Sequence, residues 1–231
     1  MLEANLSCEI MEKSMTKTAE KINLTLHLGY PKTGTTSLQN SFFRSLKDHI
    51  YLGKVGEQNF CEMLPKKFRQ VLRDIPVLDN NRFRKKHNKN VITAILCKKK
   101  RYILSDENLM YACLRPHGVK LGGTEFLDNM IGNLHYYFPR DHYNLQIVLV
   151  DRIQSDLVES MYAQCYENFY RLDKRLDTLR KFTDYLVDVN SLYGPILDYV
   201  FVDESLKNGL NGVNIKWFSY EDLKSDPEEF Y

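Results

Sequence analysis

The chain has 231 residues, of which 43% are hydrophobic and 27% are charged, so it is long enough to bury a core within one domain. This composition excludes the disordered and fibrous classes of protein. The 32 basic side chains nearly balance the 30 acidic ones, and the net charge of +2 argues against a general affinity for nucleic acid. Any anion-binding site must therefore be local.

The five cysteines are scattered, form no CxxC pair and show no spacing to His that resembles a zinc site. We therefore expect reduced thiols, no metal and a cytoplasmic location. No stretch approaches the roughly twenty apolar residues that cross a bilayer, and the N-terminus lacks the apolar core of a secretory signal. Residues 1–20 are expected to form a tail or an extra helix, and residues 21–231 a single domain. The sequence leaves the oligomeric state open.

The first predicted strand is the apolar run 24–28, which ends at a Gly-Tyr-Pro turn. Hydroxyl residues that can cap a helix follow this turn, and apolar residues then recur at helical spacing, so a helix should begin near Thr35. A second short strand is predicted over 51–53, and the stretch 57–100 has the pattern of helices. The breaks between those helices are expected near two prolines, Pro65 and Pro76.

The second half of the chain continues this alternation of strands and helices. A buried strand is predicted over 102–105, and a helix over 124–138 is closed by Pro139. The run 145–150 is the strongest strand signal, and it leads through Asp151-Arg152 into a long helical pattern that ends at Tyr170. The remaining predicted elements are helices over 176–189 and 195–206, a strand over 213–217 and an exit segment, Tyr220-Glu221-Asp222-Leu223.

This order of elements predicts an α/β fold with a mainly parallel central sheet flanked by helices. In such folds, ligands bind outside the carboxyl ends of the strands. Motifs that follow directly after a strand are therefore the first candidates for a functional site.

The segment 29–36, Gly-Tyr-Pro-Lys-Thr-Gly-Thr-Thr, has the features of an anion-binding loop. It combines flexible glycines, successive N–H groups, hydroxyls and a helix N-terminus just beyond. Lys32 adds a mobile positive charge. The P-loop of nucleotide triphosphatases places Lys after its second glycine, whereas here Lys32 precedes Gly34, which argues against a kinase or GTPase. The alternative to an anion loop is a polar turn that caps a helix.

Residues 31–36 of this loop resemble the 5′-phosphosulfate loop of sulfotransferases that use 3′-phosphoadenosine 5′-phosphosulfate (PAPS). The resemblance implies a P-loop-like sulfotransferase fold, PAPS as donor, 3′-phosphoadenosine 5′-phosphate (PAP) as product and no need for a metal. It also implies that Lys32 stabilises the charge on the departing phosphate. The donor-binding residues that it implies here are Lys32, Thr33, Gly34, Thr35, Thr36 and Ser37.

Members of this family hold the 3′-phosphate of the donor with an Arg after a later strand and a Ser eight residues further on. Arg152 and Ser160 match those two positions. A guanidinium can hold phosphate oxygens in a forked geometry, and a hydroxyl two helical turns away can face the same side. Taken alone, Arg152 could instead form a surface salt bridge, and Ser160 could be an ordinary helical serine. The Pro often found two residues after the Arg is missing here.

The general base of a sulfotransferase is a His or a Glu near the sulfate. Glu107 lies in Ser105-Asp106-Glu107-Asn108, which resembles a Ser-Ser-Glu segment of related bacterial sequences, and we expect it to be the base. Its alternative role is to cap the helix that follows. His27 lies inside the first predicted strand and is expected to be a buried core histidine.

The exit segment 220–223, followed by Asp226-Pro227, also resembles bacterial sulfotransferases. The resemblance covers residues 24–230 in outline and is dense only around the three motifs. Family members usually continue past this segment, so we expect either a compact member or a shortened chain.

These motifs together predict a cytoplasmic, bacterial sulfotransferase that acts on a hydroxyl group, on a carbohydrate or glycolipid by analogy with the relatives it resembles. Neither a nucleic-acid partner nor an integral membrane segment is expected. Two alternatives remain open at this point. One is a nucleotide or nucleoside kinase-like P-loop enzyme, and the other is a nucleotide-binding protein without catalytic activity.

Overall fold

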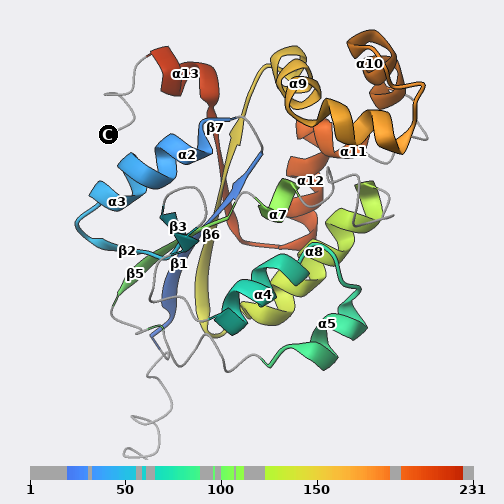
Figure 1. Ribbon diagram of the computed structural model, residues 1–231. Coiled ribbons are helices and arrows are strands. Elements are labelled where there is room, and N and C mark those ends of the chain that lie inside the picture. The colour runs from blue at the N-terminus through green and yellow to red at the C-terminus, as the bar shows by residue number, and fades with distance from the viewer. Residues whose placement is uncertain are drawn as a thin grey trace, which may run out of the picture.

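Five parallel strands form the central sheet of the protein (Figure 1). In spatial order they are β2 (His49–Tyr51), β5 (Arg101–Ser105), β1 (Ile22–Gly29), β6 (Tyr143–Asp151) and β7 (Asn214–Ser219). Every neighbouring pair is parallel, so the predicted α/β fold with a parallel sheet is confirmed. The computed structural model describes residues 20–30, 33–55, 59–60, 66–88, 96, 100–106, 108–111, 123–187 and 194–225.

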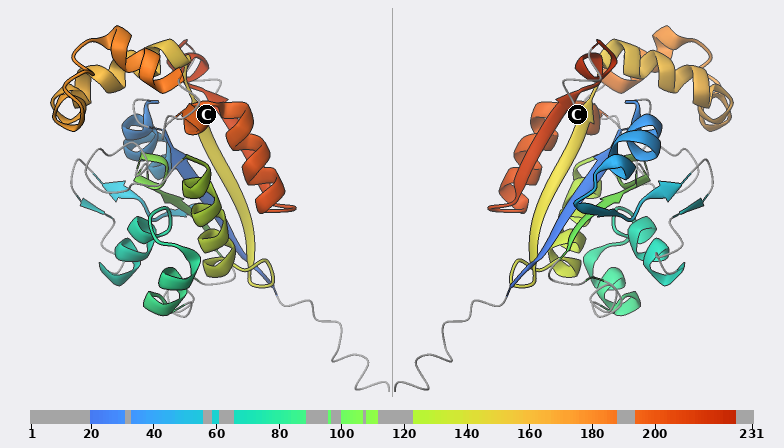
Figure 2. Two further views of the ribbon diagram at one scale, coloured as in Figure 1. Left: turned by 90° about the vertical axis from the view of Figure 1, so that its right-hand side faces the viewer. Right: turned by 90° about the vertical axis from the view of Figure 1, so that its left-hand side faces the viewer.

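Helices cover both faces of this sheet (Figures 1 and 2). One face carries a continuous helix made of α2 (Thr35–Ser37), η1 (Leu38–Phe42) and α3 (Phe43–Ser45), together with α13 (Tyr220–Ser225). The opposite face carries α8 (Gly123–Tyr137) and α12 (Tyr199–Gly209). The other described helices are α4 (Lys66–Asp74), α5 (Asn80–Lys86), α7 (Asn108–Tyr111), α9 (Gln154–Leu172), α10 (Leu179–Val187) and α11 (Gly194–Leu197).

The central strand β1 is buried on both faces, which explains its nearly continuous apolar sequence. Leu24, Leu26 and Leu28 belong to the main core, which also contains the buried side chains of α8 and α12. His27 points the other way, and its ring lies 5.1 Å from the ring of Phe43 on the α2–α3 face. The alternation of side chains along a strand therefore divides β1 between two hydrophobic layers.

The carboxyl ends of β1 and β6 meet at a switch point in the topology. These strands pair in register, with Gly29 opposite Val150. After β1 the chain turns toward β2 on one side, and after β6 it turns toward β7 on the other side. Connections that diverge in this way open a crevice at the strand ends, where open α/β sheets bind their ligands. Figure 1 shows α2, α9 and α13 at this end of the sheet.

The helix predicted from Thr35 is confirmed, although it contains a five-residue π-helical segment, η1. The second strand is His49–Tyr51 rather than 51–53, but the Leu52 N–H still donates to the carbonyl of Ile103 at 2.7 Å. A short antiparallel pair, β3 (Lys54–Val55) and β4 (Asn59–Phe60), reaches into a stretch for which helix was predicted. Strand pairing between neighbouring segments overrides helical spacing at this place.

The predicted helix 195–206 was wrong as a single element. The chain forms α11 and α12, separated at Asp198. The Asp198 carboxylate accepts the backbone N–H of Phe201 at 3.0 Å and so caps the second helix. Aspartate is among the strongest N-cap residues, and the cap outweighs the continuous apolar spacing.

A buried amide connects α8 with the turn that follows α4. Asn133 is fully buried, and its side-chain nitrogen donates to the carbonyl of Ile75 at 2.9 Å and to that of Leu78 at 2.7 Å. Buried carbonyl groups need such partners, because leaving one unpaired costs about 1–3 kcal/mol. This amide therefore holds the turn against the core.

We predict that Asn133→Leu lowers the free energy of unfolding by about 2–4 kcal/mol, because two buried carbonyls lose their donor at once. Chemical denaturation followed by circular dichroism measures this change. His135→Ala is the control, since His135 is exposed on the same helix and its loss should cost less than about 0.5 kcal/mol. Equal stabilities of the Asn133→Leu variant and the parent chain would contradict the role of this amide.

Candidate functional site

The described part of the anion loop leads directly into a helix N-terminus. Gly34 has a left-handed backbone with φ 69° and precedes α2, and the N–H of Leu38 donates to the Gly34 carbonyl at 3.1 Å. The first backbone N–H groups of a helix point out of its N-terminus, and the first turn of this helix carries no acidic side chain. The positive end of the helix dipole is therefore not neutralised by the helix itself.

The hydroxyl groups of this loop fall into two classes. Thr33 is fully buried, and its hydroxyl donates to the carbonyl of Tyr30 at 2.8 Å, so this group braces the loop from within. Thr35 is also buried, whereas Thr36 and Ser37 are exposed. Only the last two hydroxyls are therefore open to solvent. The predicted contacts of these residues with a donor remain predictions.

The ring of Tyr220 joins the anion loop to Arg152. The guanidinium carbon of Arg152 lies 5.0 Å from the centre of this ring, a cation–π distance. A Cβ atom on Gly34 would lie only 2.9 Å from Cε2 of the same ring. Glycine at position 34 is thus required both by its backbone angle and by the aromatic ring packed against it. Gly34 and Arg152, from two separate motifs, meet at one side chain.

Hydrogen bonds from two later elements hold the backbone around Arg152. The Tyr199 hydroxyl donates to the Arg152 carbonyl at 2.8 Å and accepts the Arg152 N–H at 3.4 Å. The next amide, that of Ile153, donates to the Glu221 carboxylate at 3.2 Å. The loop between β6 and α9 is therefore fastened to α12 and α13. Burial raises the pKa of Tyr199 to about 12, so its hydroxyl stays protonated at neutral pH.

Three aromatic rings pack together next to the two loops. Tyr30 is fully buried, and its ring centre lies 5.2 Å from that of Tyr199 and 6.3 Å from that of Trp217. Tyr199 and Trp217 are 5.7 Å apart, and the indole N–H donates to Asp203 at 2.9 Å. Trp217 is the single tryptophan of the chain. Its fluorescence should therefore report on changes in either loop.

Acidic side chains lie close to Arg152. Burial raises the pKa of Asp151, and the nearby carboxylates of Glu221 and Asp222 raise it further. Burial also opposes ionisation of Glu221, but hydrogen bonds from Ile153, its own backbone and Ser219 outweigh this and lower its pKa. Glu221 is therefore ionised at neutral pH, and any anion that approaches Arg152 meets opposing charge as well.

Ser160, the predicted partner of Arg152, lies in α9 and is partly buried. Both residues belong to one β6–α9 unit, at the strand end next to that of β1. Their joint action on a phosphate remains a prediction.

Pro31, Lys32 and Glu107 lie outside the described residues, but the residues that flank them are placed. Lys32 follows Tyr30 at the end of β1, and Glu107 follows Asp106 at the end of β5. These strands pair side by side, with His27 opposite Ser105. The ends of β5, β1 and β6 therefore form one edge of the sheet.

A buried polar network beneath this edge was not foreseen from the sequence. His27 is fully buried, which confirms its prediction as a core histidine, and its Nδ1 lies 2.7 Å from the Ser105 hydroxyl. The side-chain amide of Gln39 donates to the same hydroxyl at 3.0 Å. Gln39 lies in the π-helical segment η1, and such segments are frequent at functional sites. The network ties the anion-loop helix to β1 and β5.

Within the described ranges, no group of three or more His, Cys, Asp and Glu side chains is arranged to hold a metal ion. None of the helices in those ranges combines the length and the apolar composition that crossing a bilayer requires.

No known protein-family model matches the chain, and no curated protein sequence matches it. Among solved structures, it is similar to the crystal structure of a sulfotransferase from Alicyclobacillus acidocaldarius. The two share 13% sequence identity with a TM-score of 0.47, and the alignment covers 91% of this chain and 77% of that chain. Similarity at this level assigns no activity, so the candidate site stands on its own geometry.

We predict that Gly34→Ala destabilises the protein by about 1–2 kcal/mol through its left-handed backbone alone, and further through contact with Tyr220. Tyr220→Ala should remove the contact and leave the backbone cost. The double variant should therefore lose less stability than the sum of the two single variants, by about 0.5–3 kcal/mol in denaturant unfolding. Additive losses would show that the Tyr220 ring does not pack on residue 34.

Proposed function

We propose that this protein is a sulfotransferase, which transfers a sulfuryl group from PAPS to the hydroxyl group of an acceptor. The observation that carries the proposal is the meeting of two loops from separate motifs at one aromatic side chain. Gly34 of the anion loop and Arg152 of the β6–α9 loop both pack on the ring of Tyr220. A bisphosphate donor carries two anionic groups, and this junction offers a separate anion-binding element for each.

The two elements differ in a way that suits the two ends of such a donor. On the β1 side, the backbone N–H groups of residues 33–36 at a helix N-terminus would hold the 5′-phosphosulfate, with Ser37 beside them. On the β6 side, the Arg152 guanidinium would hold the 3′-phosphate, with Ser160 as a hydroxyl partner. When bound, the donor supplies a sulfuryl group attached to a phosphate that can leave as a stable anion.

Lys32 and Glu107 supply the reactive groups in this proposal. The ammonium group of Lys32 stabilises the negative charge that grows on the departing phosphate oxygen, and the helix N-terminus does the same through its dipole. The Glu107 carboxylate accepts the proton that the acceptor hydroxyl loses as its oxygen bonds to sulfur. The pairing of β5 with β1 brings the end of β5, which precedes Glu107, beside the anion loop.

We further propose that the acceptor is a carbohydrate or a glycolipid and that the reaction takes place in the cytoplasm of a bacterium. The resemblance of the three motifs to bacterial sulfotransferases supports the acceptor class. Scattered cysteines without pairing motifs support a reducing compartment.

We predict that PAP binds without magnesium and more tightly than ATP, as measured by isothermal titration calorimetry. Arg152→Ala should weaken PAP binding by about 1–3 kcal/mol, which is roughly 5- to 150-fold in Kd, because a charge-assisted contact is lost. Asp151→Asn is the matched control, because it should change the affinity for PAP in the opposite direction or not at all. It removes a carboxylate beside Arg152 and should leave the affinity equal or higher.

A preference for ATP with magnesium would favour the kinase-like alternative. Unchanged affinity of the Arg152→Ala variant for PAP would remove Arg152 from the site.

We predict that Lys32→Ala and Glu107→Gln affect the rate of sulfate transfer and the affinity for PAP differently. Glu107→Gln should lower the rate of sulfate transfer to a hydroxyl acceptor by about 10²–10⁴-fold, because the general base is lost, with PAP affinity unchanged. Lys32→Ala should lower both the rate and the affinity. Transfer of radiolabelled sulfate to a panel of glycans measures the rate. Full activity of the Glu107→Gln variant would assign the base to another residue.

A further inference from the structure

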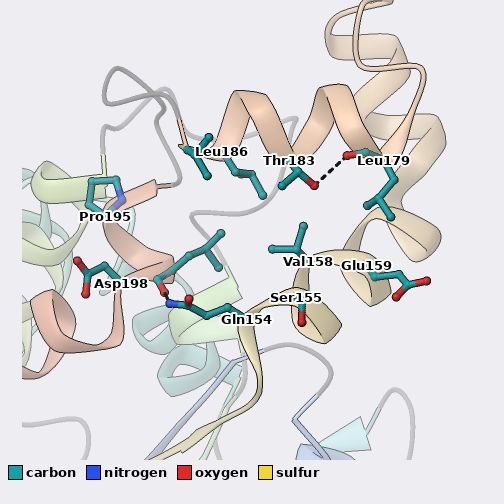
Figure 3. Close-up of a pocket in the computed structure, with 11 residues that line it drawn as sticks. Gln154, Ser155, Val158, Glu159, Leu179, Thr183, Leu186, Pro195 and Asp198 are labelled. Carbon is teal, nitrogen blue, oxygen red and sulfur yellow. Dashed lines mark hydrogen bonds between the residues drawn. The ribbon is translucent and has the colours of Figure 1, made fainter.

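A second concave site lies behind the β6–α9 loop. A cavity of about 700 Å³ opens between the start of α9, α10 and α11 (Figure 3). Its volume falls within the range of about 300–1,000 Å³ that small-molecule sites occupy. The side chains around it come from three helices, and its lining includes neither the described anion-loop residues nor Arg152. The cavity is therefore separate from the proposed donor site.

The wall of this cavity is mainly apolar. Val158, Leu179 and Leu186 line it, and so does Val187, whose exposed fraction is 75%. The remaining apolar lining residues are Pro195 and Leu197.

The polar groups around the cavity are acidic or neutral, and no described lining residue carries a positive charge. Four of them have partners within the protein. Gln154 donates to the Leu197 carbonyl at 2.7 Å, and the Thr183 hydroxyl donates to the Leu179 carbonyl. The Ser155 hydroxyl donates to Asp156 at 3.5 Å, and Asp198 caps α12. Glu159 is exposed on α9, and within the described residues no group forms a hydrogen bond or ion pair with it. The cavity thus has an apolar wall and two carboxylates, and Glu159 is the one that has no partner among the described residues.

Residues of the cavity wall are connected to Arg152 through neighbouring residues and hydrogen bonds. Leu197 and Asp198 precede Tyr199, whose hydroxyl holds both backbone groups of Arg152. Gln154, two residues beyond Arg152, is bonded to the Leu197 carbonyl. A molecule that packs against Leu197 therefore acts on the same segment that positions Arg152.

We propose that the cavity binds an amphipathic amine, with its apolar body against α10 and its ammonium group at Glu159, and that occupancy is linked to the anion site through Tyr199. The binding of the amine is independent of the sulfotransferase proposal. The linkage rests on that proposal, because it concerns the affinity of the Arg152 site for PAP. An anionic molecule is disfavoured in this cavity, since Glu159 and Asp198 would repel it.

The binding test uses three probes that share one apolar body: 4-phenylbutylamine, 4-phenylbutanol and 4-phenylbutanoate. Calorimetry should find the amine bound about tenfold more tightly than the carboxylate, with the alcohol between them. Glu159→Gln should reduce the affinity for the amine to that for the alcohol. Asp184→Asn removes an exposed carboxylate of α10 that does not line the cavity, and it should change nothing. Failure of the amine to bind, or equal affinities that Glu159→Gln does not alter, would overturn the site.

The linkage test repeats the PAP titration with the cavity saturated by 4-phenylbutylamine. We expect the Kd for PAP to change by about fivefold or more, the lower range of allosteric coupling. Tyr199→Phe keeps the aromatic packing but loses both contacts with Arg152, so it should abolish this change while amine binding persists. An identical Kd for PAP with and without the amine would overturn the linkage. Amine binding without any PAP binding would refute the sulfotransferase proposal and leave the cavity site intact.

Discussion

The parallel pairing of β1 with β6 is the interaction on which the candidate site depends. The register runs from Ile22 opposite Tyr143 to Gly29 opposite Val150, so both strands end at the same edge of the sheet. The hydrogen bonds of this ladder are buried between two helical layers, where an unpaired backbone group would be costly. A shift of one residue would turn His27 into the main core and expose a leucine to the polar network. The two loops are thus held at fixed positions by the most protected part of the fold.

Aromatic side chains connect the two loops that follow β1 and β6. Tyr220 packs on Gly34 and on the Arg152 guanidinium, while Tyr199 holds the backbone of Arg152. Rigid rings suit this task because few rotatable bonds must be ordered to cover a large area. The β7–α13 connection, which carries Tyr220, therefore belongs to the site although it contributes no charge that attracts an anion.

Positive and negative groups lie close together around the candidate site of this almost neutral chain. The positive end of the α2 dipole and the Arg152 charge lie at the same edge of the sheet, next to the acidic side chains of α13 and Asp151. Balanced charge reduces long-range attraction for anions in general. In the proposed function, selectivity for a bisphosphate would come from the fixed directions of the N–H groups and of the guanidinium.

Local pattern was sufficient for much of this fold. The run 145–150, the helix start at Thr35 and the burial of His27 followed from the sequence, because each depends on residues close together in the chain. The break between α11 and α12 at Asp198 also has a local cause, the N-cap of α12. It was missed because the apolar spacing of the same residues indicated one continuous helix.

The tertiary structure alone decided which distant residues meet. Gln39 donates a hydrogen bond to Ser105, which is 66 residues away in the sequence. Tyr220 follows β7, and its ring packs against Gly34 of the anion loop. The cavity beside α9 likewise exists only where three helices converge. Such contacts depend on the order of strands in the sheet and on the packing of helices over it. The sequence pattern of one segment does not reveal the strand order or the helix packing. Its periodicity shows which face of the segment is buried, but not which other element covers that face.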